Sequence, residues 1–158
     1  MFDDLLAANR RYASKFHDSG VAGTAARGLA VLTCIDSRID PLAMLGLIPG
    51  DAKIIRNAGA RVTDDALRSL VLAVNLLAVK RICVVQHTDC AMARSSDAEL
   101  RARFGAGDDF ETLAMPDQTA ALRDDIARIR ASKYIPESTE IGGFLFDVKT
   151  GELHPVDL

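Results

Sequence analysis

The chain has 158 residues, of which 49% are apolar and 26% are charged, and its formal net charge is −3. This length fits one globular domain with its own hydrophobic core. The weak negative charge, with no block of one sign, argues against a nucleic-acid-binding surface or a polybasic membrane patch. We therefore predict a single domain over residues 1–158, with no nucleic-acid partner and no membrane partner.

The opening stretch MFDDLLAANRRY carries two aspartates before any apolar run, unlike a secretory signal with its basic start and apolar core. The longest apolar stretch, residues 70–79, is interrupted by Asn75 and is too short to span a bilayer. The cytoplasm is therefore the expected location. There, the three cysteines are expected to be thiols or metal ligands and not disulfides.

Apolar residues recur at helical spacing over residues 2–17, which predicts an amphipathic helix. The Gly/Ala/Thr-rich segment that follows completes an expected N-terminal arm and linker over residues 1–27. The apolar run LAVLTCI, residues 29–35, predicts the first buried strand. After this strand, Asp40 is expected to cap a short helix that has Pro41 in its first position.

The segment AKIIRNAG, residues 52–59, predicts a second strand. Thr63 is the expected N-cap of a long helix over residues 64–79. This helix is apolar nearly all round, which predicts that it is buried on every side. The segment RICVVQH, residues 81–87, predicts a third strand.

In the last third of the chain, Ser96 and Glu99 form a capping-box pattern that opens a polar helix. Another helix is expected over residues 117–132, and residues 142–156 predict an edge strand, a turn at 150–151 and a short return. Because strands alternate with helices, the expected class is α/β. The predicted architecture is a mainly parallel central sheet flanked by helices, with an N-terminal helical arm and a C-terminal edge hairpin.

Two of the expected strands end in unusual side chains: the first runs into CIDSR and the third into HTDC. The carboxyl ends of neighbouring parallel strands meet at the edge where ligands gather. We therefore expect Cys34, His87 and Cys90 to converge if these strands are neighbours. Two thiolates and one imidazole suit zinc, and three protein ligands leave the fourth position open for water.

The spacing of Cys34, Asp36 and Arg38 also has a structural meaning. Alternate side chains of an extended segment share a face, so Asp36 should lie beside the metal with Cys34. Arg38 can hold the Asp36 carboxylate in a two-pronged pair. Taken singly, each of these residues would more often be an ordinary core or surface residue, and it is the grouping at two strand ends that favours a metal site.

The remaining cysteine and histidines are not expected in the site. Cys83 precedes His87 by four residues, about 13 Å at ~3.3 Å per residue of strand, so it is expected to be a core residue. His17 and His154 are expected at the surface, where either could relay protons.

Three motifs together resemble the β-class carbonic anhydrases: Cys-x-Asp-x-Arg from Cys34, Arg-Asn-Ala-Gly from Arg56, and His-x-x-Cys from His87. The resemblance covers roughly residues 29–92 and is closest to the compact branch of that family. It implies reversible hydration of carbon dioxide to bicarbonate and a proton, by attack of zinc-bound hydroxide. It also implies a homodimer whose N-terminal helix lies across the partner subunit, or a dimer of such dimers.

The resemblance implies one zinc ion per chain, held by Cys34, His87 and Cys90. It assigns catalytic roles to the pair formed by Asp36 and Arg38. The substrate pocket and its loop would then contain Ser37, Asn57, Ala58, Gly59 and Ala91.

Two positions depart from the family pattern: Ala91 stands where glycine is usual, and Gln86 stands where compact relatives often have histidine. Three alternatives stay open. The first is a hydrolase of carbonyl sulfide or carbon disulfide that uses the same metal ligands. The second is a non-enzymatic, zinc-stabilised dimer with Asp36 as the fourth ligand. The third is a metal-free redox protein with a bond between Cys34 and Cys90.

Overall fold

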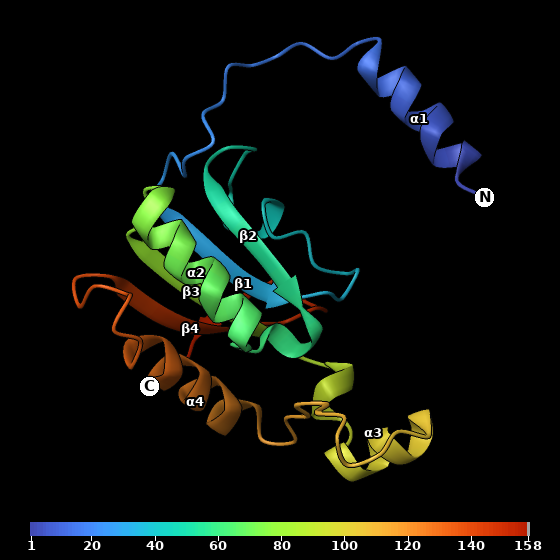
Figure 1. Ribbon diagram of the computed structural model, residues 1–158, viewed down its shortest axis with the longest axis vertical. Helices are drawn as coiled ribbons and strands as arrows, with labels where there is room; N and C mark the ends of the chain where they lie inside the picture. Colours follow the sequence, from blue (N-terminus) through green and yellow to red (C-terminus); the bar gives the residue numbers. More distant parts are fainter. Residues whose placement is uncertain (158) are drawn as a thin grey trace.

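A five-stranded sheet with the strand order β2-β1-β3-β4-β5 forms the centre of the computed structural model, which describes residues 1–157 (Figure 1). The first four strands pair in parallel, and β5 is antiparallel to β4. The predicted α/β class, with a mainly parallel sheet and a C-terminal edge hairpin, is therefore confirmed. The strands are β1 (Leu29–Cys34), β2 (Ala52–Asn57), β3 (Arg81–His87), β4 (Glu140–Phe146) and β5 (Leu153–Pro155).

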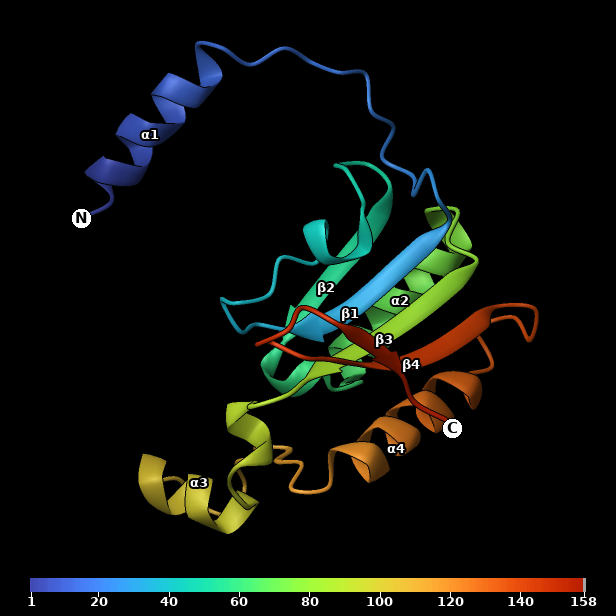
Figure 2. The ribbon, with the colours of Figure 1, turned by 180° about the vertical axis from the view of Figure 1, so that it is seen from behind.

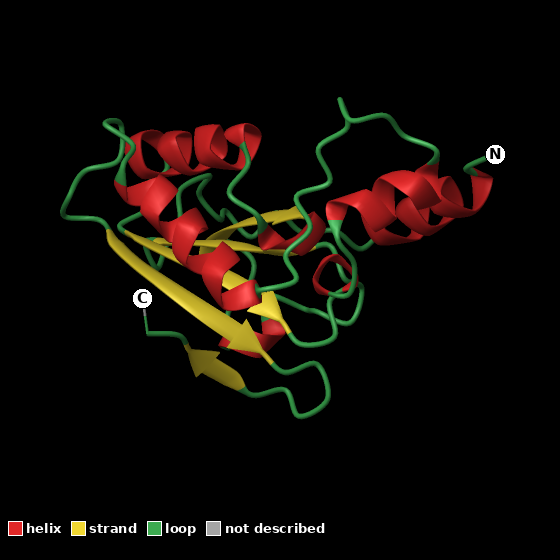
Figure 3. Ribbon diagram, turned by 90° about the horizontal axis from the view of Figure 1, so that it is seen from below, coloured by secondary structure: helices red, strands yellow, loops and turns green. Residues whose placement is uncertain are grey.

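Two helices lie on one face of the sheet, as the view from below shows (Figure 3). They are α2 and α4, and their buried residues pack with those of β1 and β3, such as Leu32 and Val84. A second buried cluster covers the opposite face, where Val31 and Val85 meet the connection between β1 and β2. Both faces of β1 are thus covered, which explains why it is an unbroken apolar run. The helices are α1 (Asp3–Ala13), α2 (Asp64–Leu76), α3 (Asp97–Phe104) and α4 (Gln118–Arg130).

The predicted helix starts are confirmed by their caps. The Thr63 hydroxyl accepts a hydrogen bond from the Ala66 N–H at the start of α2. Ser96 and Glu99 form the predicted capping box at the start of α3. At the start of α4, the Asp117 carboxylate accepts a hydrogen bond from the Ala120 N–H at 2.9 Å. These local side-chain signals fix where each helix begins.

Several predicted boundaries are corrected. Helix α1 ends at Ala13 and not at residue 17, and α4 ends at Arg130, two residues early. The short helix predicted after Asp40 is a single 3₁₀ turn, Ala43–Leu45. The predicted capping role of Asp40 is present, because its carboxylate accepts hydrogen bonds from the Leu42 and Ala43 N–H groups. Strand β1 ends at Cys34, since the chain then turns.

The prediction that α2 is buried on every side is wrong for this chain. Only Ala66, Leu70 and Ala73 are buried, whereas Leu72 is 42% exposed and Leu76 is 69% exposed. The helix lies in the outer layer, so only the face toward the sheet is covered. Leu67, Val71 and Val74 are partly buried against the core, whereas Leu72 and Leu76 face outward.

The N-terminal arm stands away from the sheet and its helices (Figures 1 and 2). None of the residues of α1 is buried, and the linker rejoins the body where the Ala25 N–H donates to the Leu77 carbonyl at 2.8 Å. None of the helices within residues 1–157 is long and apolar enough to cross a membrane. The assignment of the whole chain to one domain stays a prediction.

Candidate metal centre

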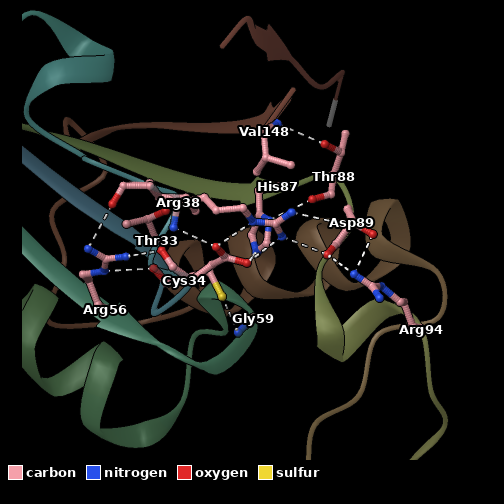
Figure 4. A network of polar contacts seen from close by, with 12 residues as sticks. Thr33, Cys34, Arg38, Arg56, Gly59, His87, Thr88, Asp89, Arg94 and Val148 are labelled. Carbon is pink, nitrogen blue, oxygen red and sulfur yellow. Dashed lines mark hydrogen bonds and ion pairs between the residues drawn. The ribbon is translucent and has the colours of Figure 1, made fainter. Parts of the chain in front are cut away.

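The three predicted ligands meet at the carboxyl edge of the sheet. Cys34 ends β1 and His87 ends the neighbouring strand β3, while Cys90 follows in the turn after β3. Their ligand atoms all lie within 4.8 Å of one another. All three residues are buried, with exposed fractions of 5%, 0% and 1% in that order. Figure 4 shows Cys34 and His87 facing each other from the two strands.

The hydrogen bonds of His87 leave one ring nitrogen for a metal. Its Nδ1 lies 2.9 Å from the Thr88 carbonyl oxygen, and since a carbonyl can only accept, Nδ1–H is the donor. In the neutral imidazole, which is the form that binds a metal, the buried Nε2 then carries a lone pair, and this nitrogen has no hydrogen-bond partner in the structure. An unpaired buried nitrogen is costly and asks for an explanation. A bound Zn²⁺ ion fits, because a backbone carbonyl typically orients a zinc-ligating histidine in this way.

The two ligand sulfurs influence each other. The neighbouring Cys90 thiol lowers the pKa of Cys34, and the backbone N–H of Gly59, 3.3 Å from the Cys34 sulfur, lowers it further. In turn, the Cys34 thiolate raises the pKa of Cys90. The pair therefore holds one proton that a cation would displace, since a coordinating thiol is deprotonated by the metal.

The predicted Asp36–Arg38 pair is present and two-pronged. Arg38 Nε donates to Asp36 Oδ1 at 3.0 Å, and Arg38 Nη2 donates to Oδ2 at 2.7 Å. These bonds hold the pKa of Asp36 well below its usual range, so its carboxylate is ionised. Asp36 Oδ2 lies 3.8 Å from the unpaired Nε2 of His87. The carboxylate therefore adjoins the Cys-His-Cys group, as the sequence predicts.

Arg38 has a second acidic partner, Asp89, which the sequence did not predict. Arg38 Nη1 donates to Asp89 Oδ2 at 2.9 Å, and Arg94 lies 2.6 Å from the other oxygen of the same carboxylate (Figure 4). Asp89 adopts a left-handed backbone with φ +59°, which aspartate tolerates better than most residues. The position of Asp89 between His87 and Cys90 indicates that it lies near the ligands, but the sequence does not indicate that it pairs with Arg38 or Arg94.

Arg56 organises the backbone of the turn that carries Asp36. Its guanidinium donates to the carbonyls of Cys34 at 2.9 Å, Asp36 at 2.7 Å and Ile39 at 3.2 Å. The sequence did not predict this role. It follows from the pairing of β2 with β1, which places Arg56 beside Thr33, the residue before Cys34.

The predicted loop after β2 closes on itself beside Cys34. Asn57 Oδ1 accepts the Arg61 N–H at 2.9 Å, and its Nδ2 donates to the Arg61 carbonyl at 2.6 Å. Gly59 adopts φ +78°, and a Cβ there would lie 3.0 Å from Met115 Cε. Glycine therefore suits both the left-handed backbone and the close packing against Met115 at this position.

The other residues predicted for the substrate pocket lie less close to the ligands. Ala58 and Met92 help line a cavity of about 390 Å³ between this loop and α3. Ala91 begins the 3₁₀ turn after Cys90, and both it and Ser37 are exposed. Gln86 is 1% exposed, and neither of its amide atoms has a hydrogen-bond partner.

The residues expected outside the site are confirmed there. Cys83 is partly buried in the core cluster opposite α2 and α4, and burial raises its pKa. His17 and His154 are exposed. Neither of the two belongs to the Cys-His-Cys group.

A buried donor set of two sulfurs and one nitrogen, placed at the carboxyl edge of a parallel sheet, is typical of mononuclear zinc enzymes. Three protein ligands leave one coordination position for the reacting water. The ionised carboxylate beside the donors could orient that water. Fold and site together therefore define a candidate metalloenzyme.

Comparison with known proteins gives the family. The carbonic anhydrase family model matches residues 29–106. Beta-carbonic anhydrase 1 of Mycobacterium tuberculosis is 35% identical over 158 residues, which cover 98% of this chain and 96% of the relative. The solved carbonic anhydrase of Streptococcus mutans is 36% identical with a TM-score of 0.89, over 99% of this chain and 97% of that one. The chain belongs to the β-carbonic anhydrase family, whose members are zinc-dependent enzymes.

The family also includes relatives that are named for a different activity. The carbon disulfide hydrolase of Acidianus sp. (strain A1-3) is 35% identical over 157 residues, which cover 80% of this chain and 76% of the relative. Similarity to both kinds of enzyme leaves the choice of substrate to be tested on this chain.

Proposed function

We propose that this chain is a zinc-dependent carbonic anhydrase that interconverts carbon dioxide and water with bicarbonate and a proton. The observation that carries the proposal is the buried Cys34–His87–Cys90 group with its unpaired nitrogen. Membership of the β-carbonic anhydrase family supports the same assignment. We also propose one zinc ion per chain, held by these three residues.

When bound, zinc lowers the pKa of a coordinated water to about 7 and so supplies a nucleophile near neutral pH. Asp36 accepts a hydrogen bond from the attacking water and fixes its direction. Arg38 holds both carboxylate oxygens and keeps Asp36 ionised. Because the pKa of Asp36 lies far below 7, it orients the water without keeping its proton, which leaves to solvent or buffer.

The alternative substrate is carbonyl sulfide or carbon disulfide, hydrolysed at the same metal centre. The similarity to the hydrolase of Acidianus sp. (strain A1-3) favours keeping this candidate. Small apolar pockets separate such substrates by only about 1–3 kcal/mol per group. The positions where this chain departs from the family, Gln86 and Ala91, are where we expect the difference to be set.

Rates for the competing substrates on one sample test the proposal. Stopped-flow hydration of carbon dioxide is measured from pH 6.5 to pH 9 on protein of known zinc content, beside carbonyl sulfide and carbon disulfide turnover. Fast carbon dioxide hydration supports the anhydrase. Slow hydration with fast turnover of a sulfur substrate would contradict it and support the hydrolase. Zinc binding with no turnover of any substrate would support the non-enzymatic alternative.

We further propose a homodimer that acts in the cytoplasm. Support for the dimer comes from the exposed apolar side chains of the N-terminal arm, which need a covering surface. They are Phe2, Leu5, Leu6, Tyr12 and Phe16.

A further inference from the structure

A buried ion pair joins the loop beside the metal centre to helix α4. Arg61 Nε donates to Asp125 Oδ2 at 2.7 Å, and the backbone N–H of Val62 donates to Asp125 Oδ1 at 3.1 Å. Asp125 is 4% exposed, and the Arg61 side chain is 14% exposed. Buried ion pairs add little net stability, because removing two charges from water offsets their attraction. We therefore expect the Arg61–Asp125 pair to have a role other than stabilising the fold.

The Arg61 guanidinium also holds the segment that precedes α4. Its Nη1 donates to the Leu113 carbonyl at 3.0 Å, and Leu113 has a left-handed backbone with φ +55°. Two residues further on, the Met115 N–H donates to the Met92 carbonyl at 2.8 Å. Met115 is 1% exposed, and the end of its side chain packs closely against Gly59. Arg61 thus fixes both the loop and the surface on which it lies.

The same loop reaches the first metal ligand. The two hydrogen bonds between the Asn57 side chain and the Arg61 backbone make residues 57–61 one closed unit. Inside this unit, the Gly59 N–H donates to the Cys34 sulfur at 3.3 Å. A displacement of Arg61 is therefore expected to displace this donor as well.

We infer that Arg61 and Asp125 are positioning residues for the metal centre. The ion pair holds the Gly59 N–H against the Cys34 sulfur, and this donor stabilises the thiolate that binds the metal. Partners behind the ligands set metal affinity in this way, and their loss typically weakens binding about 10- to 100-fold. The inference rests on the proposed zinc site and extends it to two residues that touch neither metal nor substrate.

The test compares zinc affinity with folding stability in the full chain. Arg61→Met leaves a buried, unpaired carboxylate and is expected to lower both. The double variant Arg61→Met/Asp125→Asn removes both charges and keeps an acceptor for Val62, so its stability should recover. Its zinc affinity should stay about tenfold below wild type, because no guanidinium holds the loop. Ile129→Val, in the buried face of α4, is the control that lowers stability without touching the loop.

Zinc dissociation constants come from chelator competition, and stability comes from urea unfolding of the metal-free protein. A double variant with restored stability and weakened zinc binding supports the inference. A double variant that binds zinc like wild type would overturn this inference and leave the proposed zinc site standing. An equal loss of zinc affinity in Ile129→Val would overturn the inference as well. A wild-type chain that binds no zinc would overturn the proposed function together with this inference.

Discussion

Asp36 is the residue through which this chain would direct the chemistry of its metal centre. Both oxygens of its carboxylate are held by Arg38, and one of them lies 3.8 Å from the unpaired nitrogen of His87. Arg38 is itself held by Asp89. The carboxylate is therefore ionised and fixed before any substrate arrives, which is how preorganised groups lower a barrier.

We expect Asp36→Asn to keep zinc and to lose most of the hydration rate at neutral pH. The amide keeps the shape of the side chain but offers only one acceptor oxygen and breaks the two-pronged pair. Misplacing a reacting group by about 1 Å can cost about 100-fold in rate. Stopped-flow hydration and metal analysis of the same preparation measure both effects. Full activity across the pH range would refute the role given to Asp36.

Gly59→Ala should destabilise the protein more than Gly151→Ala. Both glycines have φ +78°, so each alanine carries the left-handed backbone penalty of about 1–2 kcal/mol. At Gly151 no atom lies within 4 Å of the new methyl group, whereas at Gly59 it would lie 3.0 Å from Met115 Cε. Crowding adds about 1–3 kcal/mol there. Urea unfolding of both variants tests this, and equal losses would contradict it.

The site was only partly predictable from sequence. Cys34, His87 and Cys90 could be grouped because parallel strands end at a common edge, and Asp36 and Arg38 because alternate residues share a face. The roles of Arg56 and Asp89 could not be predicted in this way. A long guanidinium reaches carbonyls or carboxylates far away in sequence, and its partner depends on how the turns pack.

Among the elements, short-range signals predicted the most. The caps at Thr63 and Ser96 were predicted correctly because each depends on side-chain and backbone atoms within three residues. The burial of α2 was predicted wrongly, since an apolar helix surface does not reveal what covers it. Leu72 and Leu76 face outward here because the body of the chain covers only one side of the helix.

The connection between α3 and α4 should be sensitive to acid through Asp97. The Thr112 hydroxyl donates to its carboxylate, and so does the Ala114 N–H at 2.8 Å, which together lower the pKa of Asp97. A folded pKa below the unfolded value means that this stabilisation is present above the unfolded pKa of about 3.9. It is lost as the pH falls through that value toward the folded pKa.

We therefore expect the stability difference between wild type and Asp97→Asn to shrink as the pH falls from 6 to 3. Asparagine keeps an acceptor oxygen at every pH, so its bonds do not titrate. Urea midpoints across this range measure the difference, with Asp4→Asn on the exposed helix α1 as the control. Parallel curves for wild type and Asp97→Asn would show that the carboxylate adds nothing.

For the whole molecule, the main question is what covers the N-terminal arm. Helix α1 has an apolar face that is exposed along its length, including Leu5 at 60% and Tyr12 at 64%. Monomeric proteins rarely expose contiguous apolar surface without a partner. A second copy of the chain is the partner we propose, because the family resemblance implies an arm that crosses to the other subunit.

Leu5→Glu should weaken the dimer, because burying a leucine contributes about 1.5–3 kcal/mol. Both protomers carry the change, so the loss is about 3–6 kcal/mol per dimer, an increase of about 100- to 10,000-fold in the dimer dissociation constant. Ala7→Glu adds the same charge on the opposite side of the same helix, since two residues turn an α-helix by just over half a revolution, and it should change little. Sedimentation equilibrium measures both constants. Equal dissociation constants for the two variants would argue against a docked arm.

The most direct test of the account measures zinc content and carbon dioxide hydration together on wild type, Cys34→Ser and Cys83→Ser. We predict about one zinc per chain and fast hydration in wild type and in Cys83→Ser, since Cys83 lies outside the ligand group. Cys34→Ser should lose both the metal and the activity. Stoichiometric zinc with full hydration activity in Cys34→Ser would contradict the metal centre proposed for this chain.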